Sequence, residues 1–153
     1  MSASISEQRY FDDVDLGDEF EEEYVATPAH VSTYLSVSRG NAQLDEEDGR
    51  FSDASGAQAL GLERPIVPGV MSLSIITRLV TDWVGSSGRL RTLDASFRRP
   101  VLHGDRLRLL ALVTDATDES GVGRVTLDVY LENERGERPL QGVAVVDLPH
   151  RPI

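Results

Sequence analysis

The chain has 153 residues, of which 40% are hydrophobic, so it is long enough to bury the core of one domain. It contains no cysteine, which excludes disulfides, thiol catalysis and thiolate metal sites. Its formal net charge of -11 argues against nonspecific nucleic-acid binding, because that binding needs a basic surface. Residues 1–10 lack an apolar signal core and no apolar run could span a bilayer, so we expect a soluble, cytoplasmic protein without nucleic-acid or membrane partners.

The first expected elements are a strand and a helix. Residues 1–9 are polar and should form a flexible lead. Residues 20–26 carry the aromatic and β-branched residues typical of a strand, and the acidic run 18–23 suits a solvated sheet edge. Thr27 is placed to cap a helix over residues 28–38, whose apolar residues share one face.

A polar segment follows at residues 39–52 and predicts a loop, with four consecutive acids at positions 45–48. As a solvated loop these carboxylates need no functional explanation. Residues 53–60 then predict a short helix of small residues that ends at Gly61.

Residues 70–84 predict the central helix of the domain. Their apolar residues are too dense for a single stripe, which indicates a helix covered on most of its circumference and closed by Gly85. Pro68 fits the start of this helix, and Gly69 allows a ligand to approach the first free N–H groups. This end of the helix is therefore suited to accept negative charge.

The second half of the chain alternates apolar and polar residues with the period of half-buried strands. The expected strands are residues 90–101, 106–114, 124–132 and 143–148. The expected tight connections are residues 103–105, 119–123 and 133–139. An antiparallel meander that follows one apolar helix predicts an α+β fold in which the sheet curls around that helix.

Sequence motifs for catalysis are few. The chain has no phosphate-binding P-loop, no His-Glu-x-x-His helix and no Gly-x-Ser-x-Gly turn. His30 lies in the first turn of a helix, His103 in a predicted hairpin turn and His150 in the tail, and each is best interpreted as structural. We therefore expect neither a metal site nor a nucleophilic triad.

Three motifs resemble the MaoC-like branch of hotdog-fold proteins. They are Tyr10-Phe11 with Leu16-Gly17-Asp18, the turn from Glu63 to Met71 (ERPIVPGVM), and the strand entry from Phe97 to Asp105 (FRRPVLHGD). They occur in the family's order and spacing. The resemblance implies one hotdog domain over residues 1–153, in which a curved antiparallel sheet wraps a long central helix and usually pairs with a second copy.

The resemblance also implies an activity. Members of the family typically hydrate trans-2-enoyl thioesters, or dehydrate 3-hydroxyacyl thioesters, of coenzyme A or acyl carrier protein, without a cofactor. An oxyanion hole at the start of the central helix would fall on Gly69 and Val70, which agrees with the free N–H groups expected there. An acid-base pair must in addition handle water and the α-proton.

The chain departs from the family pattern where that acid-base pair should lie. Active relatives carry Gly-Asp-x-Asn-Pro-x-His after the first helix. Counted forward from that helix, the aspartate and histidine fall on Gly40 and Asp45. Counted backward from the central helix, they fall on Glu46 and Phe51, with a following family acid on Asp53. The two registers differ by six residues, which indicates an insertion, and neither supplies a histidine.

A second departure is Pro68, which stands where relatives usually have the histidine of an Ile-x-His-Gly-Met turn. The oxyanion site is kept, while the acid-base machinery is either lost or rebuilt from carboxylates. Asp45 is the first candidate and Glu46 the second, with Asp48 nearby, because a desolvated carboxylate with a raised pKa can act as a general acid or base.

Three functions stay open on the sequence. The first is a hydratase or dehydratase that uses loop carboxylates. The second is a noncatalytic hotdog, either a thioester-binding module or the structural partner of an active MaoC-like subunit. The third is a thioesterase on the same fold, which needs a carboxylate aimed at water beside the carbonyl.

The sequence also predicts how the ligand and a partner chain would be held. Arg64, Arg98 and Arg99 could contact ligand phosphates, although salt bridges with the abundant acids are the simpler interpretation. The apolar run 143–146 belongs to a sheet face that one helix cannot cover. We therefore expect a homodimer, or a heterodimer with a second MaoC-like chain.

Overall fold

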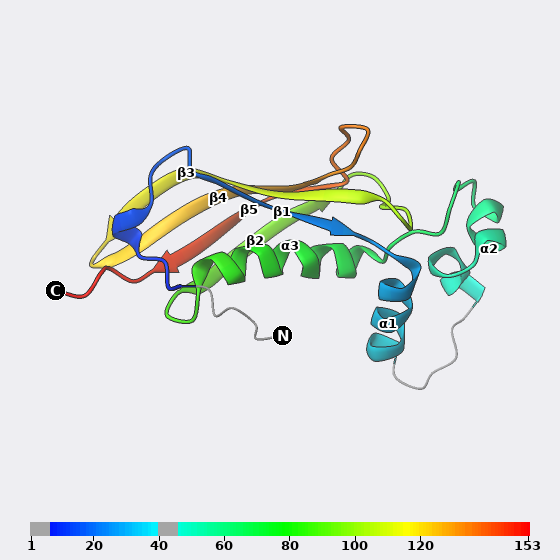
Figure 1. Ribbon diagram of the computed structural model, residues 1–153, viewed down its shortest axis with the longest axis horizontal. Coiled ribbons are helices and arrows are strands. Elements are labelled where there is room, and N and C mark those ends of the chain that lie inside the picture. Colours follow the sequence, from blue (N-terminus) through cyan, green and yellow to red (C-terminus); the bar gives the residue numbers. More distant parts are fainter. Residues whose placement is uncertain (1–6, 40–45) are drawn as a thin grey trace.

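The computed structural model describes residues 7–39 and 46–153 of the chain. In chain order its elements are the 3-10 helix η1 (Phe11–Asp13), β1 (Glu19–Val25), α1 (Pro28–Arg39), the 3-10 helix η2 (Glu46–Phe51), α2 (Ala54–Ala59), α3 (Gly69–Val84), β2 (Arg89–Phe97), β3 (Arg106–Glu119), β4 (Val122–Glu132) and β5 (Leu140–Leu148). Figure 1 shows one sheet lying along α3, with α1 and α2 beyond the end where α3 begins. The predicted α+β arrangement is confirmed.

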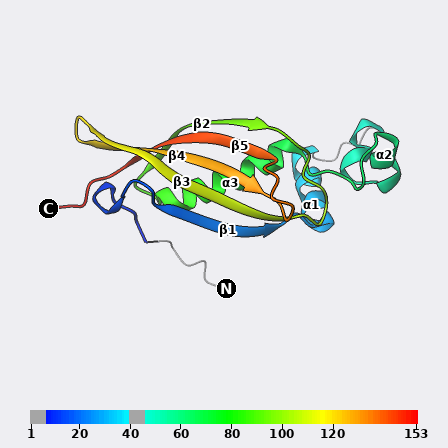
Figure 2. The same cartoon turned by 90° about the horizontal axis from the view of Figure 1, so that it is seen from above.

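The sheet has five antiparallel strands in the order β1-β3-β4-β5-β2. The hairpins β3-β4 and β4-β5 confirm the meander over residues 106–148. The prediction was wrong for β2, which pairs with β5 at the far edge rather than with β3 (Figure 2). The reason is that residues 98–105 cross one end of the sheet instead of forming a hairpin turn.

The core lies between α3 and the concave face of the sheet. One side of α3 is buried, through Met71, Ser72, Ile75, Ile76, Leu79, Val80 and Val84. It faces the inward residues of three strands, which are Leu107, Leu109, Ala111 and Val113 of β3, Val125, Leu127, Val129 and Leu131 of β4, and Leu140, Ala144, Val146 and Leu148 of β5. Alternation with period two therefore identified the inward residues of β3 and β4 correctly, whereas Phe97, which alternates with Leu93 and Ala95 in β2, is 55% exposed. β3 runs on to Glu119, beyond its predicted end at residue 114, because its pairing with β4 continues past a register shift between Val113 and Asp115. That shift breaks the alternation from which the strand was predicted.

A single chain leaves the other side of α3 open. Val70 is 62% exposed, and Ser74 and Arg78 continue the exposed stripe at helical spacing. One sheet thus covers less of the helix circumference than the density of apolar residues predicted. Within the described residues, no helix is long and apolar enough to cross a membrane.

The smaller predicted elements also form. Thr27 caps α1, since its Oγ1 accepts a hydrogen bond from the His30 amide at 3.1 Å. Asp53 caps α2 by accepting from the Ser55 amide at 3.1 Å. Of the predicted lead, residues 1–6 lie outside the described residues, whereas Gln8 donates from Nε2 to the carbonyl of Val84 at 2.8 Å.

Candidate functional site

The start of α3 presents main-chain donors that its own helix does not use. Pro68 is the N-cap and Gly69 the first helical residue. The amides of Met71 and Ser72 both donate to the carbonyl oxygen of Pro68, at 3.0 and 3.2 Å. Within the described part of the chain, the amides of Gly69 and Val70 have no hydrogen-bond partner. These two N–H groups carry the positive end of the helix dipole and can hold an oxygen that gains negative charge.

A cavity of about 310 Å³ opens beside these amides. Its walls come from the start of α3, the end of β2, the segment after β2 and the start of β5. The lining residues are Ile66, Val67, Gly69, Ser72, Phe97, Arg98, Arg99, Pro100, Val101, Pro139 and Leu140. Most of these side chains are apolar, so the cavity suits a hydrocarbon chain that ends near a polar group.

Gly69 allows close packing at this point. A Cβ atom at position 69 would lie 3.3 Å from Cε1 of Phe97, which is a tight contact. Phe97 is 55% exposed and its ring therefore has room to give way. The glycine brings the helix start against β2 and leaves its amide accessible from the cavity.

The turn before α3 is fixed to the segment that crosses the end of the sheet. The Val67 amide donates to the Val101 carbonyl at 2.7 Å, and the His103 amide to the Pro65 carbonyl at 2.8 Å. We call this contact between residues 64–67 and residues 101–105 the clamp. Arg64 reinforces it by donating to the His103 carbonyl at 2.7 Å and to Oδ1 of Asp105 at 3.1 Å. The helix start is thereby held in a defined position.

The three arginines proposed as phosphate contacts differ in their surroundings. Two donors of Arg64 are engaged in the clamp, and Arg64 does not line the cavity. Arg99 lines the cavity but pairs with Glu137 at 2.9 Å. Arg98 lines the cavity and, among the described residues, its side chain has no ion-pair or hydrogen-bond partner. Arg98 is therefore the arginine with free donors at this cavity, although it also lines the hollow on the convex face of the sheet.

The candidate acid-base residues lie partly or wholly outside the described residues. Asp45 falls outside the described residues, as do the side chains of Glu46 and Asp48. The backbone of η2, which Glu46 opens, is tied to the helix entry, because the Ile66 amide donates to the Arg50 carbonyl at 2.8 Å. The end of η2 is thus anchored on Ile66, which also lines the cavity.

The backward register of the family motif gives no second acid-base group. Phe51, the position of its histidine, is buried in the core. Asp53, the position of its following acid, caps α2. Across residues 7–39 and 46–153, no three His, Asp or Glu side chains gather as a metal site would require.

His103 is buried in the clamp rather than placed in a hairpin turn, which corrects the predicted position. Only 8% of it is exposed, and its Nε2 has no hydrogen-bond partner among the described atoms. Burial lowers the pKa of His103 because it penalises the charged ring, and the charge of Arg64 acts in the same direction. The backbone groups of Phe51 and Ile66 beside the ring oppose this shift.

We expect this burial to make the fold acid-sensitive. A histidine with a lowered pKa binds more protons when unfolded, so its contribution to stability is present above about pH 6.5 and is lost as pH falls below that value. The urea midpoint of the parent should therefore drop between pH 7.5 and 5.5, and that of His103→Gln should drop less. His30→Gln is the matched control, because His30 is exposed and its ring, among the described residues, contacts Tyr24, with Nδ1 3.3 Å from the Tyr24 hydroxyl. Equal drops in parent and His103→Gln would contradict the assignment.

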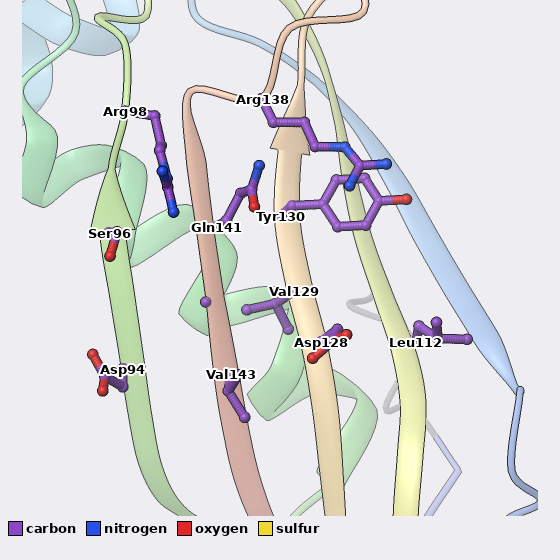
Figure 3. A pocket seen from close by; sticks show the side chains of 11 residues that line it. Asp94, Ser96, Arg98, Leu112, Asp128, Val129, Tyr130, Arg138, Gln141 and Val143 are labelled. Carbon is purple, nitrogen blue, oxygen red and sulfur yellow. The ribbon is translucent and has the colours of Figure 1, made fainter.

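The convex face of the sheet carries a second hollow of about 490 Å³, shown in Figure 3. Asp94 and Asp128 lie toward one end of it, and Arg98 and Arg138 toward the other. The guanidinium of Arg138 lies 3.9 Å from the ring centre of Tyr130. Carboxylates in the lining repel an anionic ligand, and the free helix amides are on the other side of the sheet. The cavity at the start of α3 is the better candidate site.

Comparisons with known proteins concern the family and the fold of the chain. The family model described as "MaoC like domain" matches residues 52–134, more than half of the chain, and that segment includes the start of α3. The fold is similar to the (R)-hydratase from A. caviae involved in PHA biosynthesis, at 23% identity and a TM-score of 0.76, covering 90% of this chain and 98% of that one. A comparison with curated proteins found no match.

Two further solved structures share the fold. The MaoC-like dehydratase from Rhodospirillum rubrum has 22% identity and a TM-score of 0.70, over 95% of this chain and 99% of that one. A chain of the ChsH1-ChsH2 complex from Mycobacterium tuberculosis has 19% identity and a TM-score of 0.72, over 88% and 98% of the two chains. These likenesses confirm the hotdog fold expected from the sequence motifs.

Proposed function

Because the chain belongs to the MaoC-like family, we propose that it is a hydratase or dehydratase of acyl thioesters, acting on trans-2-enoyl or 3-hydroxyacyl thioesters of coenzyme A or acyl carrier protein. The observation that carries the proposal is the pair of unused amides at Gly69 and Val70 beside a largely apolar cavity. In this assignment the apolar walls hold the acyl chain, and Arg98 meets the phosphate of the carrier, with Arg99 and Arg64 as weaker candidates.

The chemistry follows from where charge develops. When water adds to C3 of the enoyl thioester, negative charge moves to the thioester oxygen and C2 then takes up a proton. The amides of Gly69 and Val70 stabilise that oxygen as its charge grows. A carboxylate accepts the proton that water loses, and the acid form of a carboxyl group supplies the proton for C2. Asp45 is our first choice for this exchange and Glu46 the second.

The alternative is a noncatalytic hotdog that binds a thioester or supports an active MaoC-like subunit. The missing family histidine favours it, since neither register of the motif supplies one. The name of the ChsH1-ChsH2 complex describes an assembly of two proteins, which is compatible with such pairing. Thioester hydrolysis is the lesser alternative, because it would require a carboxylate directed at water beside the carbonyl.

One assay separates the three functions. The protein is incubated with crotonyl-coenzyme A, with and without a MaoC-like partner chain, while enoyl absorbance and free thiol are followed together. Loss of enoyl absorbance without free thiol supports hydration, and release of thiol supports hydrolysis. Binding by calorimetry without either change supports the noncatalytic module.

We also propose that two chains pair through β2. Both β1 and β2 are edges of the sheet, but β1 carries Glu19 and the acids that follow it, so two copies meeting there would repel. Pairing through β2 would continue the sheet and bring the open stripe of α3, with Val70, toward a partner. Light scattering at micromolar concentration should give twice the chain mass. A monomer under these conditions would contradict the proposed dimer.

A further inference from the structure

One hydroxyl of α3 differs from its neighbours. Ser74 donates to the Val70 carbonyl at 2.8 Å, and Thr77 donates to the Leu73 carbonyl at 2.7 Å, so both are satisfied by the preceding helical turn. Ser72 is only 3% exposed, yet its hydroxyl has no hydrogen-bond partner among the described residues. The oxygen is not among the fully buried side-chain atoms that lack a partner, so it stays accessible from the cavity that Ser72 lines.

The position of Ser72 places this hydroxyl beside the start of α3. Side chains of a helix lean toward its N-terminus, so a residue three positions after Gly69 places its side chain over the first turn. Ser72 and Gly69 line the same cavity. The hydroxyl is therefore close to the amides that the helix leaves free.

We propose that the Ser72 hydroxyl donates a hydrogen bond to the thioester oxygen of the ligand, as a third donor beside the amides of Gly69 and Val70. This inference rests on the proposed function and adds a catalytic residue to it. A hydroxyl that lines the cavity and has no protein partner is free to turn toward an oxygen on which charge develops.

The surroundings favour a donor over a nucleophile. A serine nucleophile needs a base within hydrogen-bond reach, and the described residues that line the cavity include neither a histidine nor a carboxylate. The buried His103 lies in the clamp and does not line the cavity. Ser72 thus keeps its proton and directs it at the ligand.

Ser72→Ala and Ser74→Ala form a matched pair that tests the proposal with crotonyl-coenzyme A. Ser72→Ala should lower kcat about 100-fold, the low end of the effect of losing one oxyanion-hole donor, with little change in KM. Ser72→Cys, which keeps the shape but donates weakly, should lose nearly as much. Ser74→Ala should match the parent, because its hydroxyl is used within the helix. A Ser72→Ala enzyme with parental kcat would overturn the inference.

A second measurement keeps the inference separate from the proposed activity. If the parent binds but does not hydrate, calorimetry with butyryl-coenzyme A should show affinity at least several-fold weaker in Ser72→Ala than in Ser74→Ala. Equal affinities would then refute the role of Ser72. The absence of hydration by the parent would separately contradict the proposed activity. A parent that neither binds nor hydrates these thioesters would refute both proposals.

Discussion

Asp45→Asn should reduce enoyl-thioester hydration by about two to four orders of magnitude, the usual contribution of a positioned general base. Affinity for the ligand should change little, because the amide keeps the size of the carboxylate and the binding groups at the start of α3 stay in place. Glu46→Gln should show the same loss if the second register is the correct one. The measurement is the initial rate with crotonyl-coenzyme A, beside calorimetric affinity for butyryl-coenzyme A.

The acidic run supplies the control for this experiment. Glu47→Gln removes the same charge from residues 45–48 without touching a position of the family motif. It should keep the parental rate if position matters rather than local charge. Activity that survives both Asp45→Asn and Glu46→Gln would remove these residues from the mechanism and favour another source of the proton.

Gly69→Pro should have the second large effect, because it deletes one of the two free amides of the oxyanion site. Removing one such donor typically costs about 100- to 1,000-fold in turnover. The fold should survive, since proline is favoured at the first position of a helix and the amide has no partner to lose within the described chain. Circular dichroism should therefore change little while turnover and thioester affinity fall.

Gly69→Ala separates the lost donor from added bulk. It keeps the amide and places a Cβ atom 3.3 Å from the ring of Phe97, which is exposed enough to shift. Alanine should cost much less activity than proline. Equal thioester affinity in the parent and Gly69→Pro would show that the helix start is the wrong place for the oxyanion site.

The sequence predicted the site best where the determinants are local. The turn from Glu63 to Met71 specified the helix start, and period two identified the inward residues of β3 and β4. The place of β2 could not be read in this way, since pairing between distant strands leaves no local signal. His103 was misplaced for the same reason, because its burial depends on the crossing of residues 98–105.

There are also physical reasons why the sequence did not assign the acid-base residue or Ser72. An insertion in residues 39–52 shifts the family motif, so spacing alone cannot choose between Asp45 and Glu46. Ser72 did leave a signal that sequence reasoning missed. It is a polar residue on the buried side of α3, between Met71 and Ile75, and its spacing from Gly69 is that of one helical turn.

The proposed function requires that an acyl thioester binds with its carbonyl oxygen at the start of α3. A crystal structure with butyryl-coenzyme A, resolving residues 39–53, tests this most directly. We expect the carbonyl oxygen within hydrogen-bond distance of the amides of Gly69 and Val70, and the acyl chain in the cavity beside Phe97. A thioester bound in the hollow on the convex face of the sheet, with the helix amides unoccupied, would refute the proposed oxyanion site.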